Sequence, residues 1–147
     1  MRRGLTLLEF LVVLSLLGLL LALATPNYLR WRAQAQLDEA VRSLAWTFQQ
    51  ARAEAKRTNS SRCVKVFTSP PGWATGTDCA NLLSPVKSLA GISITTNYSS
   101  PPVIVTFYPP YGTTDAPLKT FVLRHERYSD LERSVRVIGV TAKVVVR

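Results

Sequence analysis

The sequence is short of the residues from which most active sites are built. It has one histidine, His125, and only nine acidic residues against eighteen lysines and arginines. A single histidine and two cysteines without a C-x-x-C spacing do not make a set of zinc ligands. There is also no glycine-rich phosphate loop and no nucleophile elbow. Asp130 and Glu132 lie two positions apart in a polar stretch that is typical of a solvated turn. We therefore expect no enzymatic activity, no metal and no cofactor.

The shortage of acid leaves a formal net charge of +9. No run of basic residues is longer than two, so the charge is spread along the chain. Such an excess keeps a protein soluble, and it also favours contact with polyanions such as DNA or acidic lipid headgroups. The charge alone leaves both interpretations open.

Cysteine is scarce as well, with Cys63 and Cys79 as the pair present. Arg2 and Arg3 precede a long apolar run and would hold that end in the cytoplasm. Both cysteines would then lie outside the cytoplasm, where disulfides persist. Cys63 and Cys79 are thus a candidate disulfide, and two unpaired structural thiols are the alternative.

Charge is almost absent from residues 5–25, where Glu9 is the only ionisable side chain. A helix of this length spans roughly 31 Å, close to the thickness of the hydrocarbon core of a bilayer. The sequence therefore predicts a transmembrane helix over 5–25. A cleaved secretory signal is the alternative, because Ala22-Leu23-Ala24 offers a weak small-x-small cleavage site.

The helical pattern continues over residues 26–58 with one apolar side. Pro26 removes a backbone hydrogen bond and is expected to bend the helix. Beyond it, apolar residues recur in steps of three or four, which indicates an amphipathic helix that ends near the sequence RTNSS. This predicted stripe consists of Leu37, Val41, Leu44, Phe48, Ala51 and Ala55.

Residues 59–147 change to short β-branched or aromatic runs. The runs are CVKVF, GISITTNY, PVIVTFY, KTFVLR, SVRVI and AKVVV. Stretches rich in proline and glycine, such as TSPPGWATGTD, separate them and read as connectors. We expect five or six antiparallel strands that pack on the amphipathic part of the helix. The predicted fold is α+β, with the long helix N-terminal.

The N-terminal stretch RRGLTLLEF, followed by an apolar helix, resembles the class III signal of type IV pilins and type II secretion pseudopilins. The resemblance implies that a prepilin peptidase removes residues 1–4 as a leader by cutting after Gly4. The same enzyme would methylate the new N-terminus, Leu5, where phenylalanine is commonest in the family. Glu9, at the fifth mature position, would guide assembly. Pro26 matches the usual helix-bending proline, so the expected fold is pilin-like.

Two further motifs are similar to the GspH/FimT branch of this family. The helix-to-strand junction ARAEAKRTN fits an A-R-x-E-A-x-x-x-N pattern, and FYPPYGT fits an F-x-P-x-G-T loop. The matching residues are Ala51, Arg52, Glu54, Ala55 and Asn59 in the first and Phe107, Pro109, Gly112 and Thr113 in the second.

The resemblance implies a minor pilin or pseudopilin, a subunit with structural and assembly roles. Its partners would be the prepilin peptidase, the inner membrane before assembly, and other pilin subunits in a pilus or pseudopilus. The domain after the helix would lie in the periplasm. An ionised carboxylate at the bilayer centre costs about 2.5–3.5 kcal/mol. Glu9 could offset this cost by meeting the cationic amine of Leu5 on its own helix or on a neighbouring subunit.

The alternative function is DNA binding, as in FimT-like pilins of natural transformation. In those proteins a G-R-x-R motif lies in the C-terminal tail, but here the tail reads GVTAKVVVR, with Val140 after Gly139. In a strand, Arg133 and Arg136 would point to opposite faces, which weakens a single basic patch. The candidate DNA-binding residues are Arg133, Arg136, Lys143 and Arg147. A membrane-tethered enzyme is a third hypothesis, for which the sequence offers no nucleophile, metal set or acid pair.

Overall fold

The computed structural model describes residues 7–98, 100–114 and 118–147. The predicted leader 1–4 and the predicted cleavage and methylation positions, Gly4 and Leu5, lie outside the described residues. The chain forms two units, residues 1–33 and 34–147.

The described part of the first unit is helical and belongs to α1 (Leu7–Thr58), a helix of 52 residues. By length and composition α1 includes one stretch apolar enough to cross a membrane, and none of that stretch is buried. Glu9 stands in the first turn and Pro26 lies inside the helix. The predicted helix therefore continues past the proline, and the bend at Pro26 stays a prediction.

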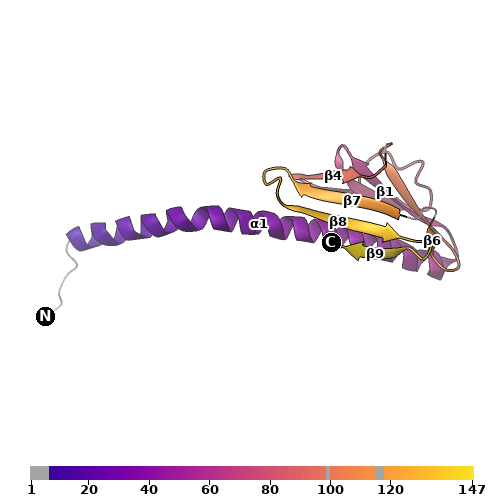
Figure 1. Ribbon diagram of the computed structural model, residues 1–147, viewed down its shortest axis with the longest axis horizontal. Coiled ribbons are helices and arrows are strands. Elements are labelled where there is room, and N and C mark those ends of the chain that lie inside the picture. Colours follow the sequence, from indigo (N-terminus) through magenta and orange to yellow (C-terminus); the bar gives the residue numbers. More distant parts are fainter. Residues whose placement is uncertain (1–6, 99, 115–117) are drawn as a thin grey trace. The chain divides into compact units, whose positions relative to one another are not determined.

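The second unit contains the rest of α1 and the nine strands formed by the described residues. One sheet has the order β3-β2-β1-β5-β6 and the other has the order β4-β7-β8-β9, and every pairing is antiparallel. The strands of the first sheet are β1 (Arg62–Thr68), β2 (Pro71–Gly76), β3 (Lys87–Ser88), β5 (Val103–Tyr108) and β6 (Thr113–Thr114). Those of the second are β4 (Ile92–Thr96), β7 (Leu118–His125), β8 (Glu132–Ile138) and β9 (Lys143–Val146). Figure 1 shows the strands gathered alongside the C-terminal half of α1.

The predicted α+β fold is confirmed, but the expected number of strands is wrong. Each of the six predicted runs contains a strand, whereas β2, β3 and β6 were not expected. The β2 segment has the composition of a connector, yet it pairs with β1 along its whole length. Pro71 takes the first position of β2, where proline removes no necessary hydrogen bond. Trp73 supplies the buried side chain that holds the strand in place.

The core forms where the apolar stripe of α1 meets both sheets. All six residues of the predicted stripe, from Leu37 to Ala55, are buried in one cluster. Phe48 is fully buried, and its ring centroid lies 5.4 Å from that of Phe121 in β7 and 6.4 Å from that of Phe107 in β5. One helical side chain therefore contacts both sheets.

Polar contacts tie the same layers together. Lys119 in β7 is buried, and its ammonium donates to the carbonyl of Ile104 in β5, across the two sheets. Lys65 in β1 is also buried and donates to the carbonyls of Cys79 and Leu82, at 3.1 and 2.7 Å. A buried ammonium without such acceptors would be costly, so these bonds fix the segments that supply them.

Cys63 in β1 and Cys79 in the segment after β2 form a disulfide, with a sequence separation of 16. Both cysteines are buried. The bridge and Lys65 attach the segment between β2 and β3 to β1, so that segment is held by one covalent and two polar contacts.

We expect the double substitution Cys63→Ser with Cys79→Ser to lower the free energy of unfolding by about 3 kcal/mol, because a loop of about 15 residues is no longer closed in the unfolded state. The measurement is urea unfolding of the full chain in a non-ionic detergent, followed by tryptophan fluorescence. Adding a thiol reductant should destabilise the wild type and leave the double variant unchanged. Equal stability of the two chains would contradict the expectation.

Candidate functional site

The junction between α1 and β1 is built by the first of the two motifs. The helix ends at Thr58, and Asn59 follows with a φ of 47°. This is the left-handed conformation that often ends a helix, and asparagine tolerates it better than most side chains. Glu54, in the last turns, lies 3.7 Å from the Nε of Arg62 at the start of β1. The junction residues thus turn the chain and connect the two elements.

The second motif packs directly against the first. Gly112 has a φ of +65°, and its amide donates to the carbonyl of Tyr108 at 2.8 Å. A Cβ at this position would lie 2.7 Å from the Cγ of Arg52 and 3.0 Å from the Cε of Lys56. The loop after β5 therefore approaches α1 more closely than any side chain would allow. The two motifs predicted from resemblance are neighbours in space, and their contacts are structural.

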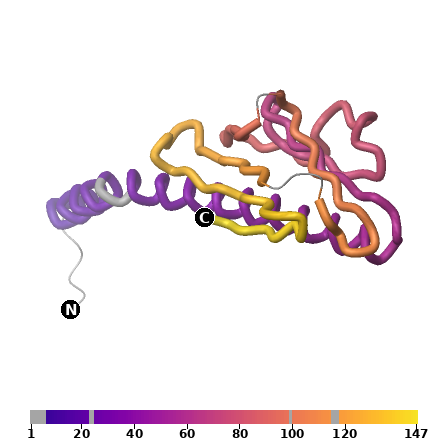
Figure 2. The backbone as a smooth tube through the Cα atoms, turned by 45° about the vertical axis from the view of Figure 1, so that its right-hand side comes forward, coloured from indigo at the N-terminus to yellow at the C-terminus, as the bar shows by residue number. Residues whose placement is uncertain are grey.

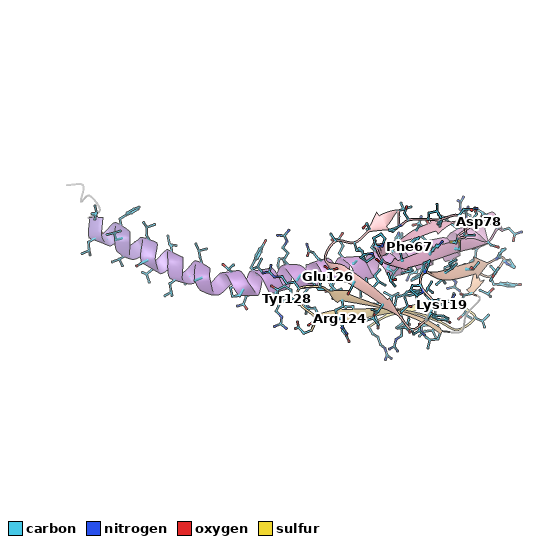
Figure 3. The ribbon with its side chains drawn as sticks, turned by 90° about the horizontal axis from the view of Figure 1, so that it is seen from above. Phe67, Asp78, Lys119, Arg124, Glu126 and Tyr128 are labelled. Carbon is cyan, nitrogen blue, oxygen red and sulfur yellow. A yellow bond between two sulfur atoms is a disulfide. The ribbon has the colours of Figure 1, made fainter. Side chains whose placement is uncertain are left out.

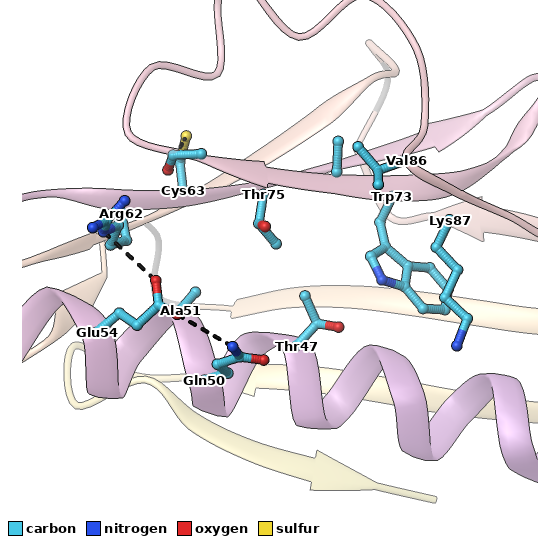
Figure 4. A pocket seen from close by; sticks show the side chains of 12 residues that line it. Thr47, Gln50, Ala51, Glu54, Arg62, Cys63, Trp73, Thr75, Val86 and Lys87 are labelled. Atoms are coloured by element: carbon cyan, nitrogen blue, oxygen red, sulfur yellow. Dashed lines mark hydrogen bonds and ion pairs between the residues drawn. The ribbon is translucent and has the colours of Figure 1, made fainter.

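On the flank of α1 that faces β2, the charged side chains of Glu54, Arg62 and Lys87 have polar or charged partners. A cavity of about 230 Å³ lies here, lined by Gln50 and Glu54 of the helix and Trp73 of β2 (Figure 4). Gln50 donates to Glu54 at 3.2 Å, and the same carboxylate lies beside Arg62. The ammonium of Lys87 donates to the hydroxyl of Ser43 at 2.8 Å.

The opposite flank of α1 faces the turn between β8 and β9 and the start of β9. A cavity of about 530 Å³ lies there. Figure 2 shows the hairpin of β8 and β9 running beside the same half of the helix. We call this space the basic cavity, and the residues that line it are Gln49, Arg52, Ala53, Lys56, Thr141, Ala142, Lys143 and Val144.

The four predicted DNA-binding residues are divided between two faces of the second sheet. Arg133 shares a face with the buried Val135 and Val137, and its Nε lies 3.3 Å from a carboxylate oxygen of Asp38 in α1. Arg136 points to the opposite face, as the strand period requires.

The two remaining predicted residues lie on the same face as Arg136. The register places Lys143 opposite Ile138, and the backbone of Arg147 pairs with that of Ser134. Arg136, Lys143 and Arg147 therefore lie on one face of the second sheet, and Arg133 lies on the other face.

The sequence alone does not indicate that Arg52 and Lys56 line the basic cavity. In the sequence, Arg52 belongs to the junction motif and Lys56 is one of many basic residues. The spacing in the sequence could have indicated that these residues share one side of the helix. Arg52 and Lys56 follow Gln49 by three and seven positions, and residues at these spacings lie on the same side of an α-helix.

The lone histidine has a structural role. His125, at the end of β7, is buried, and its Nδ1 accepts a hydrogen bond from the amide of Arg127 at 3.1 Å. Its ring lies 5.5 Å from that of Tyr128. Figure 3 shows Arg124, Glu126 and Tyr128 at this end of the sheet, with Lys119 further along β7. Within the described ranges, no group of three or more histidine, cysteine or acidic side chains could hold a metal ion.

Comparison of the sequence with known proteins gives a match to a protein family and a match to an individual relative. The model of the family described as "Type II transport protein GspH" matches residues 40–142. The pilin-like protein PilA1 of Thermus thermophilus is 51% identical over 71 residues. That stretch covers 48% of this chain and 44% of PilA1, so the match spans less than half of the relative.

Two solved structures of the type IV minor pilin FimU of Pseudomonas aeruginosa, in different crystal forms, share the fold. They superimpose with TM-scores of 0.61 and 0.60 at 17% identity. The first match covers 77% of this chain and 89% of FimU, and the second covers 76% and 92%. At this identity the likeness concerns the fold, which here is that of a minor pilin.

Replacing Gly112 with alanine should destabilise the domain by more than replacing Gly91 with alanine. Both glycines have a left-handed φ, +65° and +72°, so both variants carry backbone strain of about 1–2 kcal/mol. The new methyl group finds open space at Gly91, but it meets the Arg52 side chain at Gly112. This overpacking should add about 1–3 kcal/mol.

The measurement for this glycine pair is the midpoint of thermal or urea unfolding of the two full-length variants. Similar midpoints would show that the loop does not depend on its close approach to α1.

Proposed function

Since this chain belongs to the GspH family, we propose that it is a structural subunit, a minor pilin or pseudopilin, of a type IV pilus or a type II secretion pseudopilus. The family and the fold are those of structural subunits. The observation that carries the proposal is the long apolar stretch of α1, with Glu9 as its acid and none of its length buried. Apolar side chains on every side of a helix need lipid or other helices around them.

The long apolar helix fits a membrane-anchored pilin. In the proposed sequence of events, Arg2 and Arg3 hold the N-terminus in the cytoplasm and residues 34–147 fold in the periplasm. The disulfide between Cys63 and Cys79 is consistent with that compartment. The prepilin peptidase then cuts after Gly4, and the helix leaves the lipid to pack among the helices of other subunits.

Glu9 would direct the transfer from lipid to filament. A carboxylate is expensive in hydrocarbon, and a cationic amine nearby reduces that cost. When the amine of Leu5 on a neighbouring subunit pairs with Glu9, addition of a subunit is coupled to formation of that charge pair. Leucine side chains alone would not distinguish one helical register from another, whereas a charge pair does so.

We do not adopt DNA binding as the function of the chain. Arg133, one of the four residues proposed for it, pairs with Asp38 on the face that holds the core. The tail also has Val140 where the DNA-binding relatives have arginine.

Mass spectrometry of the chain purified from its native membrane should find a mature N-terminus at methylated Leu5. The mass should lack residues 1–4 and include one methyl group, because cleavage and methylation are successive steps of one enzyme. A chain that begins at Met1, or near Thr25 after signal-peptide cleavage, would contradict the proposal.

Glu9→Ala should lower the amount of the subunit in sheared filaments about tenfold or more, which corresponds to about 1.4 kcal/mol of lost interaction. The subunit should still reach the membrane and be cut after Gly4, because the substitution lies beyond the cut. Immunoblots of the filament and membrane fractions measure both properties. Glu39→Ala is the matched control, since Glu39 is an exposed acid further along the same helix. Normal incorporation of Glu9→Ala would falsify the assembly role.

A further inference from the structure

The polarity of α1 changes after Thr25. Before this point the hydroxyl groups are satisfied within the helix, since Ser15 donates to the carbonyl of Val12 at 2.8 Å and Thr25 donates to that of Leu21 at 2.7 Å. Hydrocarbon favours such internal bonds, because it offers a hydroxyl group no other acceptor. Beyond Thr25 the helix continues, but its side chains become polar, aromatic and basic.

We call residues 27–32 the aromatic-basic segment. Its two aromatic side chains, Tyr28 and Trp31, are 57% and 66% exposed, and their ring centroids lie 6.1 Å apart. Tyr28, Trp31 and Arg32 share one side of the helix, because residues three and four positions apart are neighbours. Arg30 lies away from that side. The segment therefore places two rings together and a cation on each side of the helix.

The position of this segment matches the headgroup layer of a bilayer. The predicted span ends at Thr25, and a rise of about 1.5 Å per residue puts Tyr28 about 4.5 Å and Trp31 about 9 Å further along the helix. The headgroup layer is about 5–7 Å thick on each side of the hydrocarbon. Long side chains on a helix lean back towards its N-terminus, so both rings reach into that layer.

The residue types of the segment also suit headgroups. Tyrosine and tryptophan have an apolar ring and a polar tip, which fits a layer that is apolar on one side and wet on the other. The arginines can donate to phosphate oxygens while their stems lie along apolar surface. Trp46 is 65% exposed as well, but it lies in the second unit, beyond the part of α1 that is apolar on every side.

We propose that the aromatic-basic segment anchors α1 in the phospholipid headgroup layer at the outer face of the inner membrane, before the subunit enters a filament. The inference rests on the proposed membrane-anchored subunit, and it adds the residues and the lipid chemistry that hold the helix at one depth. Tyr28 and Trp31 occupy the boundary with the hydrocarbon, and Arg30 and Arg32 bind headgroup phosphates. Anchors of this kind also set the tilt and rotation of a membrane helix.

The test is the fluorescence of the full chain in phospholipid vesicles whose lipids carry bromine, a quencher of tryptophan, either near the headgroup or near the bilayer centre. Bromine near the headgroup should quench the wild type, and Trp31→Phe should lose most of that quenching. Trp46→Phe is the matched control and should retain it, because Trp46 is equally exposed on the same helix. Trp73, which is buried in the core, stays in every chain.

A second reporter tests whether the segment holds the helix in place. Leu17→Trp, introduced into the Trp31→Phe chain, lies in the apolar stretch, and bromine near the bilayer centre should quench it. Tyr28→Ser combined with Trp31→Ser should let the helix shift, which would change the ratio of deep to shallow quenching of this reporter. Trp46→Ser, introduced into the Trp31→Phe chain with the reporter, should leave the ratio unchanged.

The outcomes separate the anchor from the membrane-anchored subunit. No deep quenching of the Leu17→Trp reporter would contradict the membrane anchoring on which the inference rests. Deep quenching of the reporter without shallow quenching of Trp31 would overturn the anchor alone. If Trp31→Phe then lowered the amount of subunit in sheared filaments and Trp46→Phe did not, the rings would be a contact between subunits. An unchanged ratio in the double serine variant would also overturn the proposal, because the segment would not hold the helix.

Discussion

The fold of residues 34–147 depends on the packing of Phe48 between two sheets. Its ring contacts Phe121 of the four-stranded sheet and Phe107 of the five-stranded sheet, and all three side chains are fully buried. Among the residues that the structure describes, no ladder of hydrogen bonds joins a strand of one sheet to a strand of the other. The stripe of α1 therefore joins them, with Phe48 at its centre and Lys119 as a polar contact between β7 and β5. Loss of a buried phenylalanine typically costs about 3–5 kcal/mol, which is a large fraction of the stability of a small domain.

Because Phe48 faces the core, its position also determines which residues of α1 lie on the flank beside β2 and which lie on the flank beside β9. Because the stripe through Phe48 faces the core, residues one position before or after it fall on the flanks. Gln50 and Glu54 reach the β2 side, where Glu54 meets Arg62. Arg52 and Lys56 reach the β9 side, where no residue that lines the cavity is acidic. One amphipathic helix thus places an acid on one flank and two cations on the other. Its helical period is the cause of the difference.

The part of α1 that packs on the sheets could be predicted because its apolar stripe repeats in steps of three and four, which is the period of an α-helix. Strands β1, β4, β5, β7, β8 and β9 could be predicted from their β-branched or aromatic runs. The β2 strand could not, because its proline and glycine resemble a connector and its stability comes from pairing with β1 and from the burial of Trp73. The two-residue strands β3 and β6 are too short to carry any periodicity.

The site residues also differ in whether the sequence alone can indicate their role or whether that role depends on contacts made in the folded domain. The acid at Glu9 stands out in sequence because it interrupts an apolar run, and Arg133 stands out because of its charge. Nothing local to Arg133 indicates that Asp38, far away in the chain, neutralises it. Nothing local to Arg52 indicates that Gly112 will fix its side chain or that its Nε will be buried without an acceptor. A charge count near the C-terminus therefore includes a cation that the fold pairs with an acid. Whether the fold brings an acid to a cation is a tertiary property, and no local pattern in the sequence indicates it.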